Sequence, residues 1–302
     1  MGIYARDAQL VEVEDGRVLE VELIGPPDGV PVFLHHGTPG ASGLFETLVA
    51  AGAERNVRHI SYSRPGYGAS GRLEGRTVAS CVRDVVAIAD SLGYDRFHSY
   101  GGSGGGPHSI ACAALLPDRV ISAAVIACPA PFDAVGLDWT AGMGTENLEE
   151  VAAVCAGADE LEAYLDRVAP EMANADGGEI VSVLGDLVCE ADRRALSTPY
   201  GDHLARQYAR SLSAGVFGWL DDDTALFSPW GFDLEKINVP VTLWHGAEDQ
   251  FIPVSHGEWL ATHLNVKPRI RPRDGHLSLL ISCYGDVLDD LLNTDGHGSA
   301  GG

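Results

Sequence analysis

Residues 97–109 have the sequence FHSYGGSGGGPHS, which contains the chain's only G-x-S-x-G pattern, centred on Ser103. Residues 97–100 favour a β-strand, and the small apolar residues at 110–116 favour a helix. A serine between such a strand and such a helix is typical of a nucleophile elbow, a sharp turn that exposes the hydroxyl at the carboxyl end of the strand. Glycines two residues before and after the serine leave room for the close backbone packing of this turn. The pattern therefore indicates Ser103 as a nucleophile.

A phosphate-binding loop is the main alternative for so glycine-rich a turn. Positions 102, 104 and 107 are Gly, Gly and Pro, so the dinucleotide fingerprint G-x-G-x-x-G is incomplete. No lysine follows, as a Walker A loop requires. These departures favour a nucleophile elbow over a nucleotide-binding loop.

An acid and a histidine follow the serine in the order expected for a Ser-His-Asp catalytic group. Asp249 comes just after a strand predicted over 241–245, and His276 lies in a loop after the last predicted strand, 268–271. We expect His276 to take the proton of Ser103 and later to return it. We expect Asp249 to fix the tautomer of the imidazole and to stabilise the imidazolium.

Two other acids are alternatives for the third position of this group. Glu248 directly precedes Asp249, and Asp133 follows the strand predicted over 120–128. The spacing favours Asp249 and leaves the other two open.

The rest of the chain alternates strands and helices, apart from one long interruption. This alternation predicts an α/β fold with a doubly wound, mostly parallel sheet. Residues 129–233 have helical patterns with acidic faces and no clear strand, which predicts an inserted helical cap; one of its helices is predicted over 179–196. The expected domains are a core over 1–128 and 234–293, the cap over 129–233, and a disordered tail over 294–302.

Together these motifs resemble the α/β-hydrolase superfamily over nearly the whole chain. The matching segments are HGTPG (36–40), SRPGYGAS (63–70), GGSGG (101–105), HGAEDQFIP (245–253) and DGH (274–276). The resemblance implies that the helical cap covers the pocket and selects substrates. HGTPG is also similar to the HGGPG of proline iminopeptidases, with Thr38 in place of the middle glycine.

The resemblance also places an oxyanion hole at the backbone N–H groups of Thr38 and Gly104. The residues themselves agree with this placement. Gly104 follows the nucleophile at a predicted helix N-terminus, where free N–H groups and the helix dipole favour an anion. Thr38 lies in the only other Gly/Pro turn at the end of a strand expected to neighbour the elbow. Further substrate-binding residues cannot be assigned from the sequence.

Composition excludes several other classes of function. The 302-residue chain has 20 basic and 43 acidic residues, a net charge of −23. It lacks the basic surface that nucleic acids require, and an anionic membrane surface would repel it. It has no apolar stretch long enough to cross a bilayer and no apolar secretory leader, so we expect a cytoplasmic protein. Its six cysteines include no C-x-x-C pair, and no motif implies a metal or a cofactor.

These features predict a serine hydrolase that cleaves a small carboxylic ester or lactone, with this small molecule as its partner. An aminopeptidase similar to the proline iminopeptidases is an alternative, because those enzymes hold a free substrate amine with carboxylates of the cap. Candidate carboxylates are Glu146, Glu149, Glu150 and the run Asp221–Asp223, which is otherwise interpreted as a solvated turn. A non-catalytic small-molecule receptor is a second alternative, since the same fold hosts receptors that retain the triad. A homodimer is left open.

Overall fold

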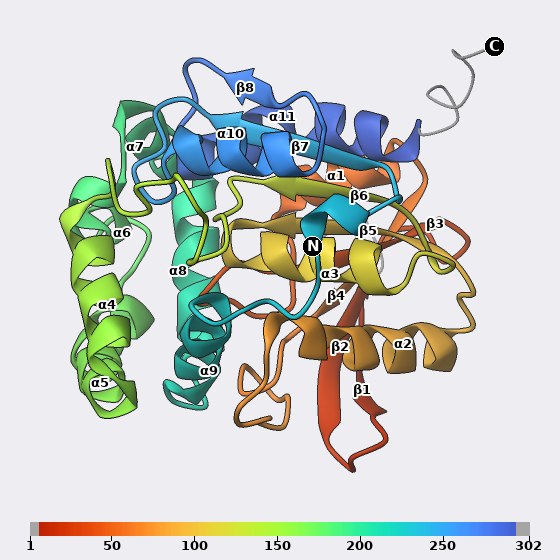
Figure 1. Ribbon diagram of the computed structural model, residues 1–302. Coiled ribbons are helices and arrows are strands. Elements are labelled where there is room, and N and C mark those ends of the chain that lie inside the picture. Colours follow the sequence, from red (N-terminus) through yellow and green to blue (C-terminus); the bar gives the residue numbers. More distant parts are fainter. Residues whose placement is uncertain (1–5, 294–302) are drawn as a thin grey trace.

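An eight-stranded sheet forms the frame of the computed structural model, which describes residues 6–293 (Figure 1). The strands stand in the order β1-β2-β4-β3-β5-β6-β7-β8. Their bounds are β1 Arg6–Glu12, β2 Val18–Ile24, β3 Val30–His35, β4 Val57–Tyr62, β5 Phe97–Gly102, β6 Val120–Ile126, β7 Val241–Gly246 and β8 Arg269–Arg271. β2 pairs antiparallel with β1 and with β4, and the remaining pairs are parallel. The predicted α/β fold with a mostly parallel sheet is confirmed.

Helices cover both faces of this sheet. One face packs against α2 (Cys81–Leu92), α3 (Gly106–Leu115) and α10 (Val254–His263). The other face packs against α1 (Glu46–Ala53) and α11 (His276–Leu292). β6 lies between the two layers, which explains its nearly continuous apolar sequence, VISAAVI.

The carboxyl ends of β3 and β5 lie side by side near the middle of the sheet. β3 pairs with both β4 and β5, and His35 at the end of β3 is opposite Gly101 of β5. The loops that follow these two strands therefore meet at the edge of the sheet where open α/β folds bind their ligands. These loops hold Thr38 and Ser103.

Residues 129–233, which we call the cap segment, contain helices and no strand. Figure 1 shows these helices gathered on one side of the sheet, with α4 and α5 outermost and α8 and α9 next to the core. Their bounds are α4 Thr145–Ala156, α5 Ala158–Asn174, α6 Ile180–Val183, α7 Glu190–Leu196, α8 Pro199–Ser211 and α9 Phe217–Leu226. The prediction of a single helix over 179–196 is wrong, because two helices, α6 and α7, lie there. Gly185 adopts a φ of +55°, in the left-handed region, and separates α6 from α7.

No helix within residues 6–293 combines the length and the apolar character needed to span a bilayer. The same residues contain no group of three or more His, Cys, Asp or Glu side chains arranged to hold a metal ion. The tail predicted over 294–302 lies outside the described residues.

Candidate active site

Ser103 stands at the tip of a sharp turn between β5 and α3. Its φ is +52°, a conformation that residues with a side chain rarely adopt. A Cβ at Gly101 would collide with the carbonyl oxygen of Gly105, and a Cβ at Gly105 would collide with the carbonyl oxygen of His35. Both positions therefore require glycine, which is the physical reason for the G-x-S-x-G pattern. The half-buried Ser103 side chain is left facing a cavity.

His276 and Asp249 form a buried pair beside this cavity. The prediction that His276 lies in a loop is wrong, because α11 begins directly after Gly275 and His276 is its first residue. His276 lines the cavity together with Ser103. Its Nδ1 atom lies 2.8 Å from Oδ2 of Asp249. Oδ1 of Asp249 accepts hydrogen bonds from the backbone N–H groups of Phe251 and Ile252, at 2.9 and 2.8 Å. The carboxylate therefore favours a proton on Nδ1 of His276, which leaves Nε2 free as a base.

The surroundings of His276 favour its protonated form. Burial alone would lower the pKa of the ring, but the charge and hydrogen bond of Asp249, together with the charge of Asp192, outweigh burial and raise the pKa of His276. The Phe251 ring stacks on the imidazole with ring centroids 4.6 Å apart. Nε2 of His245 lies 3.5 Å from Oδ2 of Asp249, and burial lowers the pKa of His245. These contacts therefore stabilise the imidazolium form of His276.

The three predicted alternatives for the acid of this group lie in different surroundings. Asp133 and Glu248 are exposed, whereas Asp249 is buried against the imidazole of His276. Ser103 shares the cavity with His276, and within residues 6–293 the two side chains form no direct hydrogen bond. Catalytic hydrogen bonds of this kind often tighten only when substrate binds.

The predicted oxyanion donors, Thr38 and Gly104, lie against each other. A Cβ added to Gly104 would collide with Oγ1 of Thr38 and would lie 3.3 Å from the Thr38 backbone nitrogen. Gly104 follows Ser103 in a short 3₁₀ turn that leads into α3, so its N–H is one of the free donors of a helix start. Both residues line a smaller chamber that also contains Ser103. This placement fits a pair of N–H donors to an oxyanion formed at Ser103.

Thr38 is tied to the cap segment through a buried carboxylate, Asp222 of α9. Oγ1 of Thr38 donates a 2.8 Å hydrogen bond to Asp222, and the hydroxyl of Tyr67 donates one of 2.9 Å. The guanidinium groups of Arg64 and Arg76 form ion pairs with the same carboxylate. Burial alone would raise the pKa of Asp222, but the two arginines hold it well below its usual value. Asp222 therefore remains ionised and joins the cap segment to residues 36–40, which we call the oxyanion loop after the predicted role of Thr38.

The interpretation of Asp221–Asp223 as a solvated turn is therefore wrong. All three acids lie within α9 and are buried. Asp221 forms an ion pair with Arg72, Asp222 binds the cluster around Thr38, and Asp223 faces the smaller chamber. The pattern of three consecutive acids suggested exposure, but the side chains point to three different surroundings.

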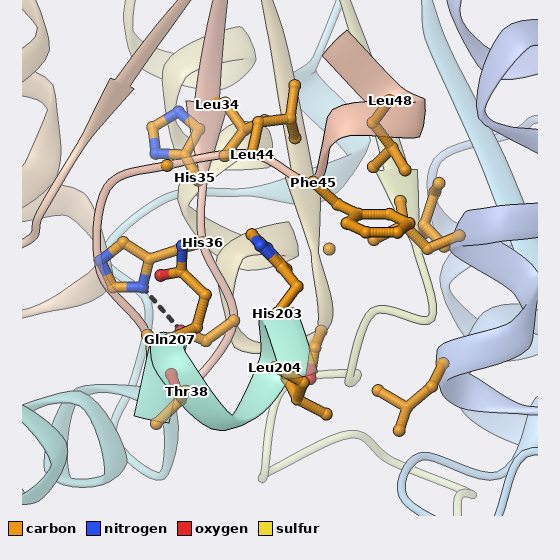
Figure 2. A pocket seen from close by; sticks show the side chains of 18 of the residues that line it. Leu34, His35, His36, Thr38, Leu44, Phe45, Leu48, His203, Leu204 and Gln207 are labelled. Atoms are coloured by element: carbon orange, nitrogen blue, oxygen red, sulfur yellow. Dashed lines mark hydrogen bonds between the residues drawn. The ribbon is translucent and has the colours of Figure 1, made fainter. Parts of the chain in front are cut away.

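The larger cavity has a volume of about 200 Å³ and mostly apolar walls. Figure 2 shows Leu34, Leu44 and Phe45 among its lining residues, with His203 projecting into the same space from α8. Burial lowers the pKa of His203 to about 4, so this ring is neutral near pH 7. The cavity therefore offers Ser103 a mostly apolar compartment.

The smaller chamber, of about 90 Å³, has a different character. Glu150 of α4 and Asp223 line it together with the aromatic side chains of Trp139 and Phe227. Within residues 6–293, Oδ2 of the buried Asp223 has no hydrogen-bond partner. Burial raises the pKa of both acids, and the negative charge of Glu150 raises that of Asp223 further. A carboxyl pair with an unfilled hydrogen-bonding position therefore lines the same chamber as Ser103.

A family model described as "alpha/beta hydrolase fold" matches residues 30–154, which include both the oxyanion loop and the elbow. The eight-stranded sheet and this match show that the chain has the α/β-hydrolase fold. Among curated relatives, a non-heme chloroperoxidase of Streptomyces lividans is 25% identical over 289 residues, which cover 93% of this chain and 97% of that protein. A 2-hydroxy-6-oxononadienedioate/2-hydroxy-6-oxononatrienedioate hydrolase of Burkholderia vietnamiensis is 27% identical, over 87% of each chain.

Solved structures share this α/β-hydrolase fold. An enol-lactonase from Burkholderia xenovorans matches with a TM-score of 0.68 and 17% identity, over 94% of this chain and 99% of that chain. A hydrolase from Pseudomonas aeruginosa matches with a TM-score of 0.68 and 19% identity, over 95% and 98% of the two chains. At these identities the likeness concerns the fold. None of the relatives named here is a proline iminopeptidase, so the similarity of HGTPG to that group stays a prediction.

Sequence analysis missed the contacts of two acids of the cap segment, although Asp222 belongs to the run of candidate carboxylates. Asp222 binds the oxyanion loop, and Asp192 of α7 accepts a hydrogen bond of 3.2 Å from the backbone N–H of His276. No local motif marks either acid, because their partners lie 184 and 84 residues away. For Asp222 there was one signal, since Trp219 and Leu226 share its helical face at spacings of three and four residues.

Proposed function

We propose that this chain is a serine hydrolase that cleaves a small carboxylic ester or lactone through an acyl-enzyme on Ser103. The observation that carries the proposal is that Ser103 shares its cavity with His276, whose Nδ1 lies 2.8 Å from Asp249. The apolar walls and the volume of about 200 Å³ suit a small acyl group. The relatives that are named as a hydrolase and as an enol-lactonase support this class of reaction.

In the first half of the proposed reaction, Oγ of Ser103 attacks the substrate carbonyl and its proton moves to Nε2 of His276. The N–H groups of Thr38 and Gly104 stabilise the resulting oxyanion, and such electrostatic stabilisation is usually the largest catalytic contribution. When the tetrahedral intermediate collapses, the ester C–O bond breaks and the leaving oxygen takes the proton from Nε2. Asp249 stabilises the imidazolium until that transfer.

The second half repeats these steps with water as the nucleophile. His276 takes a proton from the water while its oxygen attacks the acyl-enzyme, and the oxyanion again faces the same two N–H groups. Collapse returns the proton to Oγ of Ser103 and releases the carboxylic acid. The cycle consumes one water molecule and uses only residues of this chain.

Fluorophosphonate labelling and a panel of p-nitrophenyl esters test this proposal. The wild-type chain should react with the phosphonate and hydrolyse short-chain esters, and Ser103→Ala should abolish both while retaining the native circular dichroism spectrum. Labelling that persists in Ser103→Ala would contradict the assignment of the nucleophile. If the wild-type chain neither reacts nor hydrolyses any ester but binds one ligand tightly, the receptor alternative replaces the enzyme.

A second candidate, an aminopeptidase similar to the proline iminopeptidases, is favoured by the carboxyl pair in the smaller chamber. An ammonium group there would supply the hydrogen-bond donor that Oδ2 of Asp223 lacks within the described residues. It would also offset the negative charge of Glu150, and the rings of Trp139 and Phe227 would add cation–π attraction. The substrate would then be an amide or ester that carries a free amine beside the scissile carbonyl.

Glu150→Gln distinguishes the two candidates, with Glu149→Gln as its matched control. Glu149 is the preceding residue of α4, but it is exposed and pairs with Arg167 on the surface. If the second candidate holds, Glu150→Gln raises KM for aminoacyl-naphthylamides and leaves neutral esters unaffected, whereas Glu149→Gln changes neither. If p-nitrophenyl esters are the better substrates and Glu150→Gln leaves amine-bearing substrates unchanged, the second candidate is wrong.

A further inference from the structure

We propose that Asp192, a buried carboxylate of the cap segment, is a positioning residue for His276 and makes the cap a working part of the catalytic machinery. The inference rests on the proposed function, because that function assigns His276 the role of base. It adds to that function a second acid, contributed by a segment that contains none of the three triad residues.

The contacts of Asp192 are concentrated on the first turn of α11. Its Oδ1 accepts the backbone N–H groups of Leu277 at 3.0 Å and Ser278 at 2.7 Å, and also the hydroxyl of Ser278 at 2.7 Å. Its Oδ2 accepts the backbone N–H of His276 at 3.2 Å. Asp192 is fully buried, so water does not compete for these bonds. One side chain thus satisfies three of the free N–H groups of the helix start.

The DGH motif explains why the acceptor for the first N–H groups of α11 must come from another segment. Helices usually begin with a Ser, Thr, Asp or Asn whose own side chain accepts these N–H groups. Here the N-cap residue is Gly275, which has no side chain, and a Cβ at this position would collide with Asp192 and with Cys189 of the cap segment. Asp192 therefore occupies the space and performs the role of the missing N-cap side chain.

Because His276 is the first residue of α11, the bonds to Asp192 determine where its Cα–Cβ bond points. The same ring must meet Asp249 through Nδ1 and the substrate side through Nε2. A rotation of the first turn of α11 would disturb both contacts together. A misplacement of about 1 Å at a reacting group can cost about 10²-fold in rate, so the orientation of this turn has a direct effect on catalysis.

The charge of Asp192 also acts on the imidazole. The titratable groups that face His276 are Asp249 and His245 on the β7 side and Asp192 from α7, with Tyr200 of α8 nearby. The negative charge of Asp192 adds to that of Asp249 in raising the pKa of His276. A negative charge at a helix N-terminus is also favoured by the helix dipole. Removal of this charge, with the shape kept, should therefore lower the pKa of His276.

Asp192→Asn tests the proposal, and Glu190→Gln is its matched control. Glu190 lies on the same helix and loses the same charge, but it is exposed and pairs only with Arg194 within the described residues. We expect Asp192→Asn to lower kcat by up to about 10²-fold with little change in KM, and to move the acid limb of the kcat/KM profile to lower pH. The sign follows because only neutral His276 acts as base, so a lower pKa extends activity downward. Glu190→Gln should match the wild-type chain.

Ser278→Ala separates the orientation of the first turn of α11 from the charge of Asp192. It also provides the test if Asp192→Asn does not fold. It removes one donor to Asp192 and the oxygen that accepts the Gly275 N–H at 2.8 Å, but it keeps the carboxylate. We expect kcat to fall while the pH midpoint stays in place. If a folded Asp192→Asn has the kcat and pH profile of Glu190→Gln, or if Ser278→Ala retains full kcat, the proposal is wrong.

A titration of the His276 ring by NMR keeps this test independent of turnover. The signal is assigned by its loss in His276→Gln, and its midpoint is compared between the wild-type chain, Asp192→Asn and Glu190→Gln. A lower midpoint in Asp192→Asn alone supports the contact even if the chain proves to hydrolyse no ester, an outcome that would refute the proposed function instead. Equal midpoints in all three proteins would refute the role of Asp192.

Discussion

Asp249→Asn should inactivate the protein through the tautomer of His276, and the geometry indicates how. Oδ1 of Asp249 faces two backbone donors, the N–H groups of Phe251 and Ile252 at 2.9 and 2.8 Å. An asparagine must therefore place its carbonyl oxygen on that side, because its NH₂ group would oppose both donors. The NH₂ group then faces Nδ1 of His276, in the place where Oδ2 of Asp249 accepts a hydrogen bond in the wild-type chain.

The consequence is a proton on the wrong ring nitrogen. Nδ1 becomes the acceptor, so the proton of the neutral ring moves to Nε2, which can no longer take a proton from Ser103. This exchange in Ser-His-Asp groups costs about 10⁴-fold in kcat, which corresponds to about 5.4 kcal/mol of transition-state stabilisation. The substitution is isosteric and keeps both backbone hydrogen bonds, so the melting temperature should change much less than the rate.

The assay is steady-state hydrolysis of a p-nitrophenyl ester, with circular dichroism melting as the measure of folding. Asp133→Asn and Glu248→Gln are the controls, since both acids are exposed and were alternatives for the same role. Both should retain wild-type kcat. If Asp249→Asn kept a tenth or more of the wild-type rate, or if Asp133→Asn lost activity instead, the reasoning from the Asp249 contacts would be refuted.

Three further predictions concern the oxyanion loop, the elbow and the pH dependence. Thr38→Val should lower kcat with little change in KM, because the loop loses its hydrogen bond to Asp222. Thr38→Ser should keep most of the wild-type rate. Equal rates for the two variants would count against a role of this hydrogen bond. Gly101→Ala should destabilise the fold by about 1–3 kcal/mol through overpacking against the Gly105 carbonyl. Gly102→Ala is the control, because its new Cβ would meet nothing nearer than 3.6 Å, and it should melt close to the wild-type temperature. The reverse order of melting temperatures would contradict the elbow geometry. The kcat/KM profile of the wild-type chain should rise with pH through a midpoint above the ordinary histidine value of 6.5, because the pKa of His276 is raised and only its neutral form is a base; a midpoint below 6.5 would contradict it.

The placement of Ser103, Asp249 and His276 could be predicted because short segments determine their own backbone, whereas their catalytic roles stay predictions. The two glycines that flank Ser103 at a distance of two residues are required by contacts within the turn and with the end of β3. Asp249 and His276 follow the ends of neighbouring strands, β7 and β8, so the order of a parallel sheet brings their loops together. In each case a local pattern and the topology suffice.

The role of the cap segment could not be predicted in the same way. Asp192 and Asp222 act on groups 84 and 184 residues away, and their effect depends on how cap helices pack on the core. The acidic pattern of α9 looked typical of a solvated surface, because no sequence signal revealed Arg64 and Arg76 as partners of Asp222. Burial of these acids is a property of the packed structure.

The most direct test of the central claim is to trap the acyl-enzyme. The chain is mixed with a p-nitrophenyl ester, quenched in acid during the first turnovers, digested and examined by mass spectrometry. The account predicts that the peptide containing Ser103 gains the mass of the acyl group, and that Ser103→Ala shows no such gain. An acyl group on another residue, or the same gain in Ser103→Ala, would contradict it.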